Sequence, residues 1–320
     1  MKIVIPGGTG QVGTVLARAF HKDGHEVVVL SRSPSKAPWR TVSWDARSLG
    51  AWAAEFEGAD AVINLAGRSV NCRYTDANRK AIKESRVDSA RVVGEAIAGA
   101  KNPPRVWLQM STATIYAHRF EAPNDEASGI IGGAEVGAPD TWRFSIDVAA
   151  SWERAVDEAP TPRTRKVKMR SAVVMNPDNG SPFDLLLKLV RYGLGGRSGD
   201  GRQYVSWIHY EDLVRSVYWL IEHDNLSGAV NLAAPNPLPN AEFMRELRAA
   251  WGISFGLPAN TLMLEAAALF MRTETELILK SRRVTPARLL ESGFEFRFPT
   301  WKEAATDLCR RWRDLRKAAA

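Results

Sequence analysis

The first 175 residues alternate between short apolar runs and longer stretches in which apolar residues recur every three or four positions. The short runs predict strands, and the periodic stretches predict helices with one buried face. Such alternation is typical of a parallel sheet covered by helices on both faces. We therefore expect an α/β fold with a doubly wound parallel sheet of the Rossmann type. The expected strands span residues 3–5, 26–30, 41–44, 60–65, 105–110 and 167–175, and the expected helices follow Val12 and span residues 76–100 and 142–158.

From about residue 178 the pattern becomes mostly helical, with short extended pieces between the helices. We expect two domains: a cofactor-binding sheet domain over residues 1–177, and a smaller, mostly helical substrate lobe over residues 178–320. The lobe would lie over the carboxyl edge of the sheet, where a substrate meets a cofactor. The expected helices span residues 183–192, 211–222, 240–251, 259–271 and 301–316, and the extended pieces span 204–208 and 229–232.

A glycine-rich turn follows the first apolar run and opens directly into a periodic helix. Unpaired amides at a helix N-terminus, together with the helix dipole, suit a pyrophosphate. In this pattern the first glycine permits the turn, the second lets the backbone approach the phosphates, and the third lets the helix pack on the strand. We therefore expect dinucleotide binding; the alternative is an ordinary strand-to-helix turn. The expected contacts are Gly7, Thr9, Gly10, Gln11, Val12 and Gly13.

The end of the second predicted strand indicates which dinucleotide binds. A carboxylate there would hold the adenosine ribose of NAD, but the chain reads Ser31-Arg32-Ser33. Arg32 suits a 2′-phosphate, with serine hydroxyls as hydrogen-bond donors, so we expect NADP(H). The alternative is a solvated surface arginine. Asp45, after the predicted strand at residues 41–44, is a candidate neighbour of the adenine.

Composition narrows the class of protein further. The chain has 320 residues, 45% of them hydrophobic, and a net charge of +7 from 43 basic and 36 acidic residues. The basic residues are spread out, so we expect attraction for a polyanionic cofactor and no nucleic-acid partner. The two cysteines, Cys72 and Cys309, fit a reducing cytoplasm and predict neither a disulfide framework nor a metal site. With no signal peptide or membrane-length apolar run, we expect a cytoplasmic monomer or homodimer that takes a small-molecule substrate.

Two further segments carry a resemblance to a known family. The predicted strand at residues 60–65 ends in Asn64-Leu65-Ala66-Gly67, and the one at residues 105–110 ends in Met110-Ser111-Thr112-Ala113-Thr114-Ile115-Tyr116-Ala117. With the glycine turn, these segments resemble the short-chain dehydrogenase/reductase superfamily, in the extended and atypical branch that includes nucleotide-sugar epimerases. The resemblance implies that Thr112 takes the catalytic Ser/Thr position. It also implies cofactor contacts from Leu65, Ala66, Gly67, Ser111 and Val173.

Segments along the whole chain are similar to one epimerase-like subfamily with a C-terminal domain of unknown function. Pro6, where the family usually has Thr, and Arg272-Thr273-Glu274, where many relatives carry Gly-Glu, depart from that pattern. The matching segments are Glu84-Ser85-Arg86-Val87, Gly193-Leu194-Gly195-Gly196, residues 201–209, residues 281–286 and Gly293-Phe294-Glu295-Phe296.

The superfamily's usual catalytic pair is missing. That chemistry needs a Tyr and a Lys four residues later on one helix face, where the Lys lowers the Tyr pKa. The resemblance places the pair at Ser145 and Ala149, and none of the six tyrosines has a Lys four residues on. Three interpretations stay open: a different acid, a substrate such as an imine or enone that needs less help, or NADP(H) binding by a sensor or scaffold without chemistry.

The candidate acids each have a structural alternative. Thr112 is the strongest candidate, because a hydroxyl beside the nicotinamide can polarise a carbonyl. Tyr116 follows a strand and suits packing, His118 lies in a polar loop and suits exposure, and His209 suits ordering of its loop. Tyr74 and Asp147 are weaker candidates by position. The substrate candidates are Arg202, Tyr204 and Trp207, with a surface arginine as the alternative for the first.

These inferences together favour an NADP(H)-dependent oxidoreductase of the atypical short-chain type. Its expected substrate is an unidentified small carbonyl, imine or related compound, and the hydride chemistry belongs to the cofactor. A non-catalytic NADP(H)-binding regulator is the main alternative. A cofactor-retaining nucleotide-sugar epimerase is a weaker one, because the Tyr-Lys pair is absent.

Overall fold

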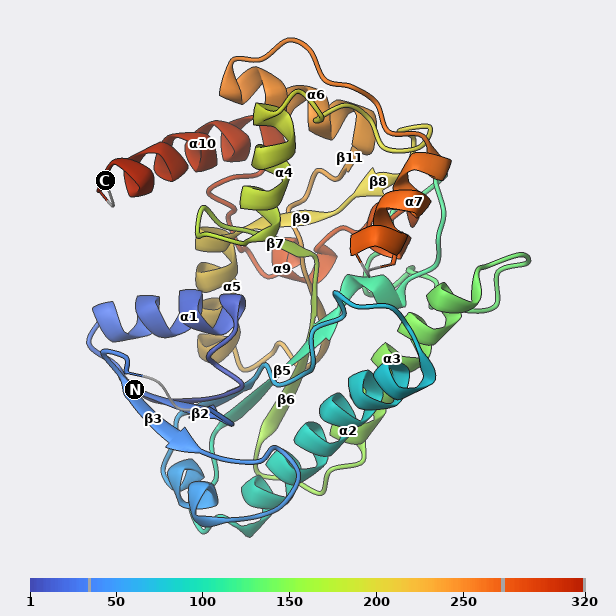
Figure 1. The fold of residues 1–320 in the computed structure, drawn as a ribbon. Coiled ribbons are helices and arrows are strands. Elements are labelled where there is room, and N and C mark those ends of the chain that lie inside the picture. Colours follow the sequence, from blue (N-terminus) through green and yellow to red (C-terminus); the bar gives the residue numbers. More distant parts are fainter. Residues whose placement is uncertain (34–35, 272–273, 319–320) are drawn as a thin grey trace.

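The fold is built on a seven-stranded, wholly parallel sheet (Figure 1). The computed structural model describes residues 1–33, 36–271 and 274–318, so the sequence departure at residues 272–273 lies outside the described residues. Strands follow the spatial order β10-β6-β5-β4-β1-β2-β3. This confirms the expected doubly wound α/β sheet. The strands are β1 (Lys2–Pro6), β2 (Glu26–Ser31), β3 (Arg40–Ser43), β4 (Ala61–Asn64), β5 (Val106–Thr112), β6 (Arg165–Ser171) and β10 (Gly228–Leu232).

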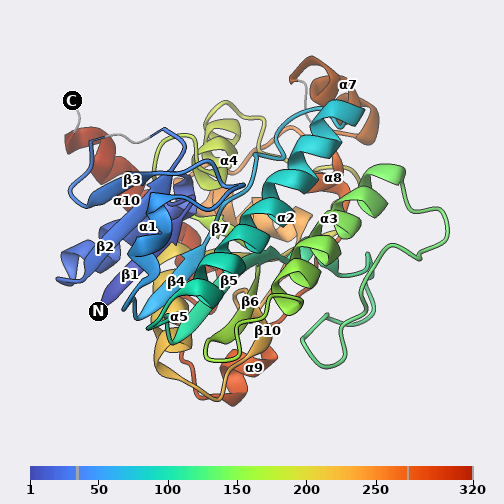
Figure 2. The same cartoon turned by 90° about the horizontal axis from the view of Figure 1, so that it is seen from below.

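Helices cover both faces of the sheet because the side chains of each strand alternate. In β1, Ile3 and Ile5 pack toward α1 (Gln11–Lys22) and α5 (Tyr210–Glu222), whereas Val4 packs on the opposite face. That second face is covered by α2 (Asp76–Gly99) and α3 (Asp140–Asp157), which lie side by side (Figure 2). The 3₁₀ helix η1 (Ala51–Phe56) adds Trp52 and Phe56 to the same cluster. Two apolar layers therefore enclose the sheet.

The chain changes direction across the sheet between β1 and β4. After β1 it builds β2 and β3 on one side, and then β4, β5 and β6 on the other. Loops that leave β1 and β4 in opposite directions open a crevice at the carboxyl ends of these strands, which is where open α/β sheets bind ligands. The fold therefore places the glycine turn and the Leu65–Gly67 loop at one crevice.

A second, smaller core lies above this carboxyl edge. There α4 (Pro182–Arg191), α6 (Asn240–Trp251) and α10 (Trp301–Ala318) pack around buried aromatic side chains that include Phe183, Trp207, Phe243 and Trp301. The lobe also contains two short strand pairs: β7 (Val173–Met175) beside β9 (Trp207–His209), and β8 (Tyr204–Val205) beside β11 (Leu238–Pro239). The other helices are η2 (Ala113–Ile115), α7 (Thr261–Met271), α8 (Glu276–Leu279) and α9 (Ala287–Glu291).

The structure differs from the expected division at residue 177. Strand β10, which we expected in the C-terminal lobe, pairs with β6 as an edge strand of the main sheet. The chain returns there because α5 buries Leu213, Val217 and Leu220 against the sheet. The expected strand at 167–175 is in fact two strands, since the chain leaves the sheet at Ala172 to pair β7 with β9.

The segment after α8 ties the two parts together. The Arg283 carbonyl accepts the Asn124 N–H at 2.6 Å, and the Asn124 carbonyl accepts the Thr285 N–H at 3.0 Å. Lys280 donates to the Thr114 carbonyl at 2.8 Å, close to the end of β5. Residues 280–285 thus hydrogen-bond to loops of the sheet domain along their length.

Candidate active site

The glycine turn has the close contacts that its sequence requires. Gly7 has a φ of +75°, and a Cβ there would lie 2.6 Å from the Ala66 Cα. At Gly13 a Cβ would lie 2.4 Å from the Gly8 Cα, because helix α1 packs directly on the turn. At Gly10, by contrast, the nearest atom to a Cβ would be the Gly7 carbonyl oxygen, 3.9 Å away. Gly7 and Gly13 are thus required by packing, whereas Gly10 leaves open space above the helix N-terminus.

The first turn of α1 is free to bind an anion. Gly10 is its N-cap, no described side chain caps its amides, and no acidic residue lies in the turn. Such amides and the helix dipole together favour a negatively charged group. Because Gly10 lines an open cavity, these amides are accessible to an anionic group such as a phosphate.

That cavity, of about 710 Å³, extends from the glycine turn to the end of β2. Ser31 lies deep in it: its hydroxyl is 3.3 Å from the Thr9 hydroxyl and accepts the Ser33 N–H at 3.2 Å. The Arg32 side chain is exposed at the rim. Among the residues expected to hold the cofactor, the cavity brings together Gly7, Thr9, Gly10, Ser31, Arg32, Asp45, Leu65, Ala66 and Gly67.

Asp45 lines the cavity but its carboxylate is already engaged. It accepts hydrogen bonds from the backbone of Arg47 at 2.9 Å and of Ser48 at 3.0 Å, and another from the Ser48 hydroxyl. These bonds, led by the Ser48 hydroxyl, lower the pKa of Asp45 to about 2. The carboxylate therefore shapes its own turn, and a role beside adenine stays a prediction.

The Leu65–Gly67 loop is held from below by a buried amide pair. Asn64 donates to the Gln109 side chain at 2.9 Å, and the Asn64 side-chain oxygen accepts the Ala66 N–H at 3.1 Å. Both amide side chains are fully buried between β4 and β5. The pair positions Leu65, which lines both this cavity and the next.

A second cavity, of about 310 Å³, adjoins the first at Leu65. Its wall includes Gln11, Val12 and Val173, which we expected to contact the cofactor. None of the residues that line it is charged, and most are apolar. The remaining wall consists of Met110, Ser171, Ala172, Val174, Asn176 and Pro182.

Strand alternation separates two neighbouring hydroxyls at the end of β5. Met110 faces the second cavity, and Thr112, two residues on, projects from the same face of β5 but lies beyond the residues that line either cavity. Its hydroxyl oxygen accepts the Thr114 N–H at 3.1 Å. Among the described residues no acceptor takes the hydroxyl hydrogen. Ser111 points the other way and donates to Glu153 on α3 at 2.7 Å, so the expectation of a cofactor contact from its side chain is wrong.

Tyr116 is in a buried structural network and not in a cavity wall. Its side chain is 2% exposed; its hydroxyl donates to Asn231 at 2.9 Å and accepts from Arg170 at 2.9 Å. Burial raises the pKa of Tyr116, with Arg170 opposing the rise. Arg170 is held in turn by two 2.8 Å bonds to Glu153. These contacts support the packing alternative and argue against Tyr116 as a proton donor.

His118 is half-buried and also has a structural partner. Its Nδ1 accepts the Ser281 N–H at 2.8 Å, and its ring stands 4.7 Å from that of Trp142. Burial, and then the nearby Lys280 charge, lower the pKa of His118, so the ring is neutral near pH 7. His118 therefore helps to dock the C-terminal segment, and it lines neither cavity.

The position of the missing catalytic pair is filled by groups that sequence reasoning missed. Ser145 donates to Glu276 at 2.5 Å, and Ala149 is fully buried. Glu276, Lys280 and Arg282 are all buried beside it. Burial raises the pKa of Glu276 and lowers the pKa of Lys280 to about 8. Glu276 and Lys280 are four residues apart, and Lys280 and Arg282 are two apart. Charged residues at these spacings are common on solvated surfaces, so the local sequence does not distinguish this buried cluster from an exposed one.

The three expected substrate residues do not converge on a cavity. Arg202 lies over the Phe120 ring at 5.7 Å, and Tyr204 packs beneath the Arg283 guanidinium at 4.6 Å. Trp207 is fully buried in the core of the lobe, with its ring 5.0 Å from that of Trp301. A substrate cannot reach a fully buried ring, so the expectation for Trp207 is wrong.

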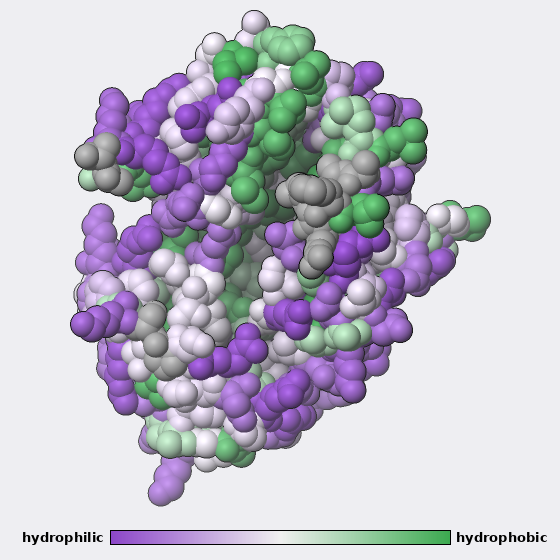
Figure 3. All heavy atoms as spheres, in the orientation of Figure 1, coloured by the Kyte–Doolittle hydropathy of each residue, from purple (hydrophilic) through white to green (hydrophobic). Residues whose placement is uncertain are grey.

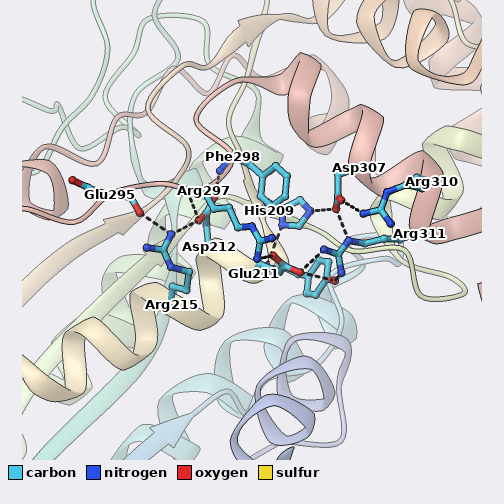
Figure 4. Close-up of polar contacts among 11 residues, drawn as sticks. His209, Glu211, Asp212, Arg215, Glu295, Arg297, Phe298, Asp307, Arg310 and Arg311 are labelled. Atoms are coloured by element: carbon cyan, nitrogen blue, oxygen red, sulfur yellow. Dashed lines mark hydrogen bonds and ion pairs between the residues drawn. The ribbon is translucent and has the colours of Figure 1, made fainter. Parts of the chain in front are cut away.

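His209 also belongs to the framework, in a charged network between α5 and α10 (Figure 4). Its Nδ1 accepts the Glu211 N–H at 3.2 Å, which caps α5, and its Nε2 lies 3.3 Å from Asp307. Burial would raise the pKa of Asp307, but hydrogen bonds from His209, Arg310 and Arg311 outweigh it and lower that pKa. The geometry supports the loop-ordering alternative for His209.

Metal-ligand clusters and membrane-spanning helices are both absent from the described part of the chain, residues 1–33, 36–271 and 274–318. It contains no group of three or more His, Cys, Asp or Glu side chains placed to hold a metal ion. None of its helices combines the length and the apolar character needed to cross a membrane.

Comparisons with known proteins agree with this architecture. Residues 3–131 match the NAD dependent epimerase/dehydratase family, and residues 261–308 match a domain of unknown function, DUF1731. The human epimerase family protein SDR39U1 is 32% identical over 302 residues, covering 93% of this chain and 96% of its own length. YfhF of Bacillus subtilis, another epimerase family protein, is 29% identical and covers 96% of this chain and 98% of itself.

Solved structures give the same result. The crystal structure of human SDR39U1 (isoform 2) with NADPH has a TM-score of 0.84 and 30% identity, covering 97% of this chain and 99% of that one. A nucleoside-diphosphate sugar epimerase from Corynebacterium glutamicum has a TM-score of 0.74 and 27% identity, covering 99% of this chain and 61% of that one. This chain is therefore a member of the NAD dependent epimerase/dehydratase family, of the short-chain dehydrogenase/reductase type, and its relatives are the SDR39U1 epimerase family proteins.

Proposed function

We propose that the protein is an NADP(H)-dependent oxidoreductase that works without a Tyr-Lys pair. The observation that carries this proposal is the end of β2, where Ser31, Arg32 and Ser33 border the larger cavity and no carboxylate replaces them. A guanidinium is suited to a 2′-phosphate, which distinguishes NADP(H) from NAD(H). The NADPH in the human SDR39U1 structure supports the same choice.

The residues present fit the whole dinucleotide. The diphosphate would lie on the first turn of α1, the adenosine half toward Arg32, and the nicotinamide half in the smaller cavity, between Val12 and Val173. When bound, NADPH supplies a hydride. The walls of the smaller cavity are mostly apolar, and a hydrogen bond formed beside apolar groups is stronger than one in bulk water.

Thr112 is the residue that we assign to the chemistry. Its oxygen is held by the Thr114 N–H, and its hydrogen remains available to a substrate oxygen on the same face of β5 as Met110. A hydroxyl in that position stabilises the negative charge that develops on a carbonyl oxygen during reduction. The final proton then comes from solvent, because no tyrosine on α3 supplies it.

The test combines a substrate panel with a pair of Thr112 variants. NADPH consumption is measured with carbonyls, imines and sugar nucleotides. With a substrate that is turned over, Thr112→Val should lower kcat by roughly 100-fold to 1000-fold, the effect of removing one such donor. Thr112→Ser keeps the hydroxyl and should restore most of the rate, and neither change should alter the Kd of NADPH.

Two outcomes would overturn this proposal. Tight NADPH binding with no turnover across the panel would favour a sensor. A sensor is the second candidate function because the Tyr-Lys pair is missing. Conversion of a sugar nucleotide without net loss of NADPH would favour an epimerase. Unchanged kcat in Thr112→Val would remove Thr112 from the mechanism.

A further inference from the structure

An apolar stripe runs along the exposed side of α4 and begins at the smaller cavity. Pro182, which lines that cavity, is followed on α4 by Leu185 and Leu189 and, at the C-cap of the helix, by Tyr192. Steps of three, four and three residues keep these side chains on one helix face. Leu185 is 52% exposed, Leu189 43% and Tyr192 79%. We propose that this stripe binds the extended, uncharged apolar chain of the substrate, whose reactive end lies in the smaller cavity; this inference rests on the proposed function.

The loop after α4 extends this apolar surface. It pairs with the segment before α7: Leu257 N–H donates to the Gly193 carbonyl at 2.8 Å, and Gly199 N–H donates to the Ala259 carbonyl at 2.8 Å. This pairing holds Leu257 beside the end of α4 and Ala259 beside Gly199. Figure 3 shows hydrophobic surface over α4, beside a hollow in this face of the molecule.

Exposed apolar side chains continue the stripe beyond the end of α4. Leu194 and Leu257, each 51% exposed, lie in the paired loop. A run of exposed apolar side chains of this kind is typical of a binding site. Because Pro182 belongs to both the stripe and the cavity wall, the stripe is continuous with the proposed nicotinamide site and not a separate surface.

The charges on α4 and in the wall of the smaller cavity indicate an uncharged ligand. The cations of α4 are engaged elsewhere: Lys188 pairs with the buried Asp184 at 2.8 Å, and Arg191 lies over the Trp312 ring at 4.7 Å. No residue that lines the smaller cavity is charged. The diphosphate of a sugar nucleotide would need cations or amides along this path. An apolar chain needs neither, so the observations favour it over a sugar nucleotide.

The length of the stripe indicates the size of the chain. Ten residues of helix separate Pro182 from Tyr192, which is about 15 Å at 1.5 Å per residue. That is roughly half the hydrocarbon thickness of a bilayer, which is the depth of one acyl chain. We therefore assign a substrate with a fatty-acyl-sized or terpenoid-sized chain that ends in a carbonyl. In its reduction the C=O π bond breaks, the carbon receives hydride from NADPH, which becomes NADP⁺, and the oxygen receives a proton from water.

The test measures binding separately from turnover. Nile red is bound to the full-length protein with NADPH, and straight-chain alcohols from butanol to dodecanol displace it. Each added methylene should tighten binding by up to about four-fold while it is buried. Leu189→Asp, and separately Leu185→Asn, should weaken dodecanol by at least about ten-fold, because each places a polar group against the chain. The affinity for butanol, whose chain is too short to reach the stripe, should change less than about two-fold in these variants.

Leu315→Asp is the matched control, since Leu315 is 45% exposed on α10, outside the stripe. It should leave the whole alcohol series unchanged. Equal affinity for butanol and dodecanol would overturn the inference, as would equal losses in the Leu189 and Leu315 variants. Straight-chain aldehydes are then tested for NADPH oxidation. Chain-length-dependent binding without oxidation would overturn the proposed function alone, whereas oxidation with no dependence on chain length would overturn the stripe alone.

Discussion

Replacing Arg32 tests the choice of cofactor at one side chain. Arg32 is exposed at the rim of the larger cavity, and among the described residues it has no ion-pair partner. Its replacement therefore leaves no buried charge unpaired and should not change stability. Arg47 also lines this cavity, but it lies 3.4 Å from Asp88 and 3.7 Å from Glu84. Arg68, the third arginine in the wall, donates to the Asn78 side chain at 2.8 Å. Arg32 is the wall arginine with no side-chain partner among the described residues, so we expect it to bind the 2′-phosphate.

The expected size follows from the exposure of the site. A hydrogen bond to a charged group contributes roughly 1.5–3 kcal/mol, and solvent screening places an exposed arginine near the lower end. Arg32→Gln should therefore weaken NADPH by about ten-fold to thirty-fold. Arg32→Asp adds repulsion of about 1 kcal/mol for each charge on the phosphate at about 4 Å in water, so it should cost roughly a further ten-fold or more.

Isothermal titration calorimetry with NADPH and with NADH measures both effects. NADH lacks the 2′-phosphate, so its Kd should change less than about two-fold in Arg32→Gln. Lys36→Gln is the control, because Lys36 is an exposed cation near Arg32 in sequence but outside the cavity wall. Equal losses of NADPH and NADH affinity in Arg32→Gln would refute the reasoning, as would an equal effect of Lys36→Gln.

Three further predictions follow from contacts in the turn, the sheet and the lobe. Gly10→Ala should fold and lose less than about 1 kcal/mol of unfolding free energy, measured in urea, yet it should bind neither NADPH nor NADH. Gly13→Ala should lose about 1–3 kcal/mol of unfolding free energy, because a Cβ at residue 13 collides with backbone atoms and a Cβ at residue 10 does not. Glu153→Gln breaks a buried pair and should lower the unfolding free energy by about 3–5 kcal/mol; the exposed Glu95→Gln should cost under about 0.5 kcal/mol. Asp307→Asn should destabilise by about 1–3 kcal/mol at neutral pH. Because the folded pKa of Asp307 lies below its ordinary 3.8, that difference should shrink as the pH falls through 3.8 toward about 3, and a pH-independent difference would contradict the ion-pair account.

Local patterns carried enough information to predict the sheet and the geometry of the glycine turn. The glycine turn, the apolar strands and the residues at the end of β2 depend on neighbours close in sequence, and the structure brings them to one crevice. Strand alternation also sets the face of β5 from which Thr112 projects, whereas the catalytic role of Thr112 stays a prediction. These features depend on backbone period and turn chemistry, which a single sequence contains.

Features that depend on distant pairing were beyond local patterns. Strand β10 reads as an extended piece in a helical region, and only its pairing with β6 makes it part of the sheet. Trp207 was expected at the substrate, but an aromatic residue in a short strand has the same pattern whether it faces a ligand or Trp301. The buried Glu276 and Lys280 gave no signal, because their burial depends on partners more than 130 residues earlier: Ser145 for Glu276 and the Thr114 carbonyl for Lys280.

The backbone hydrogen bonds of Asn124 with Arg283 and Thr285 limit where this chain can be truncated and how far its two parts can rotate. With β10 also inserted in the sheet, a fragment ending at residue 177 would lack an edge strand and the partner of that loop. We expect such a fragment to be insoluble and the intact chain to melt in one cooperative transition. A wide hinge rotation between the sheet domain and the lobe would break these backbone hydrogen bonds. We therefore expect a ligand to enter and leave through movement of the helices around the hollow, without rotation of one part against the other.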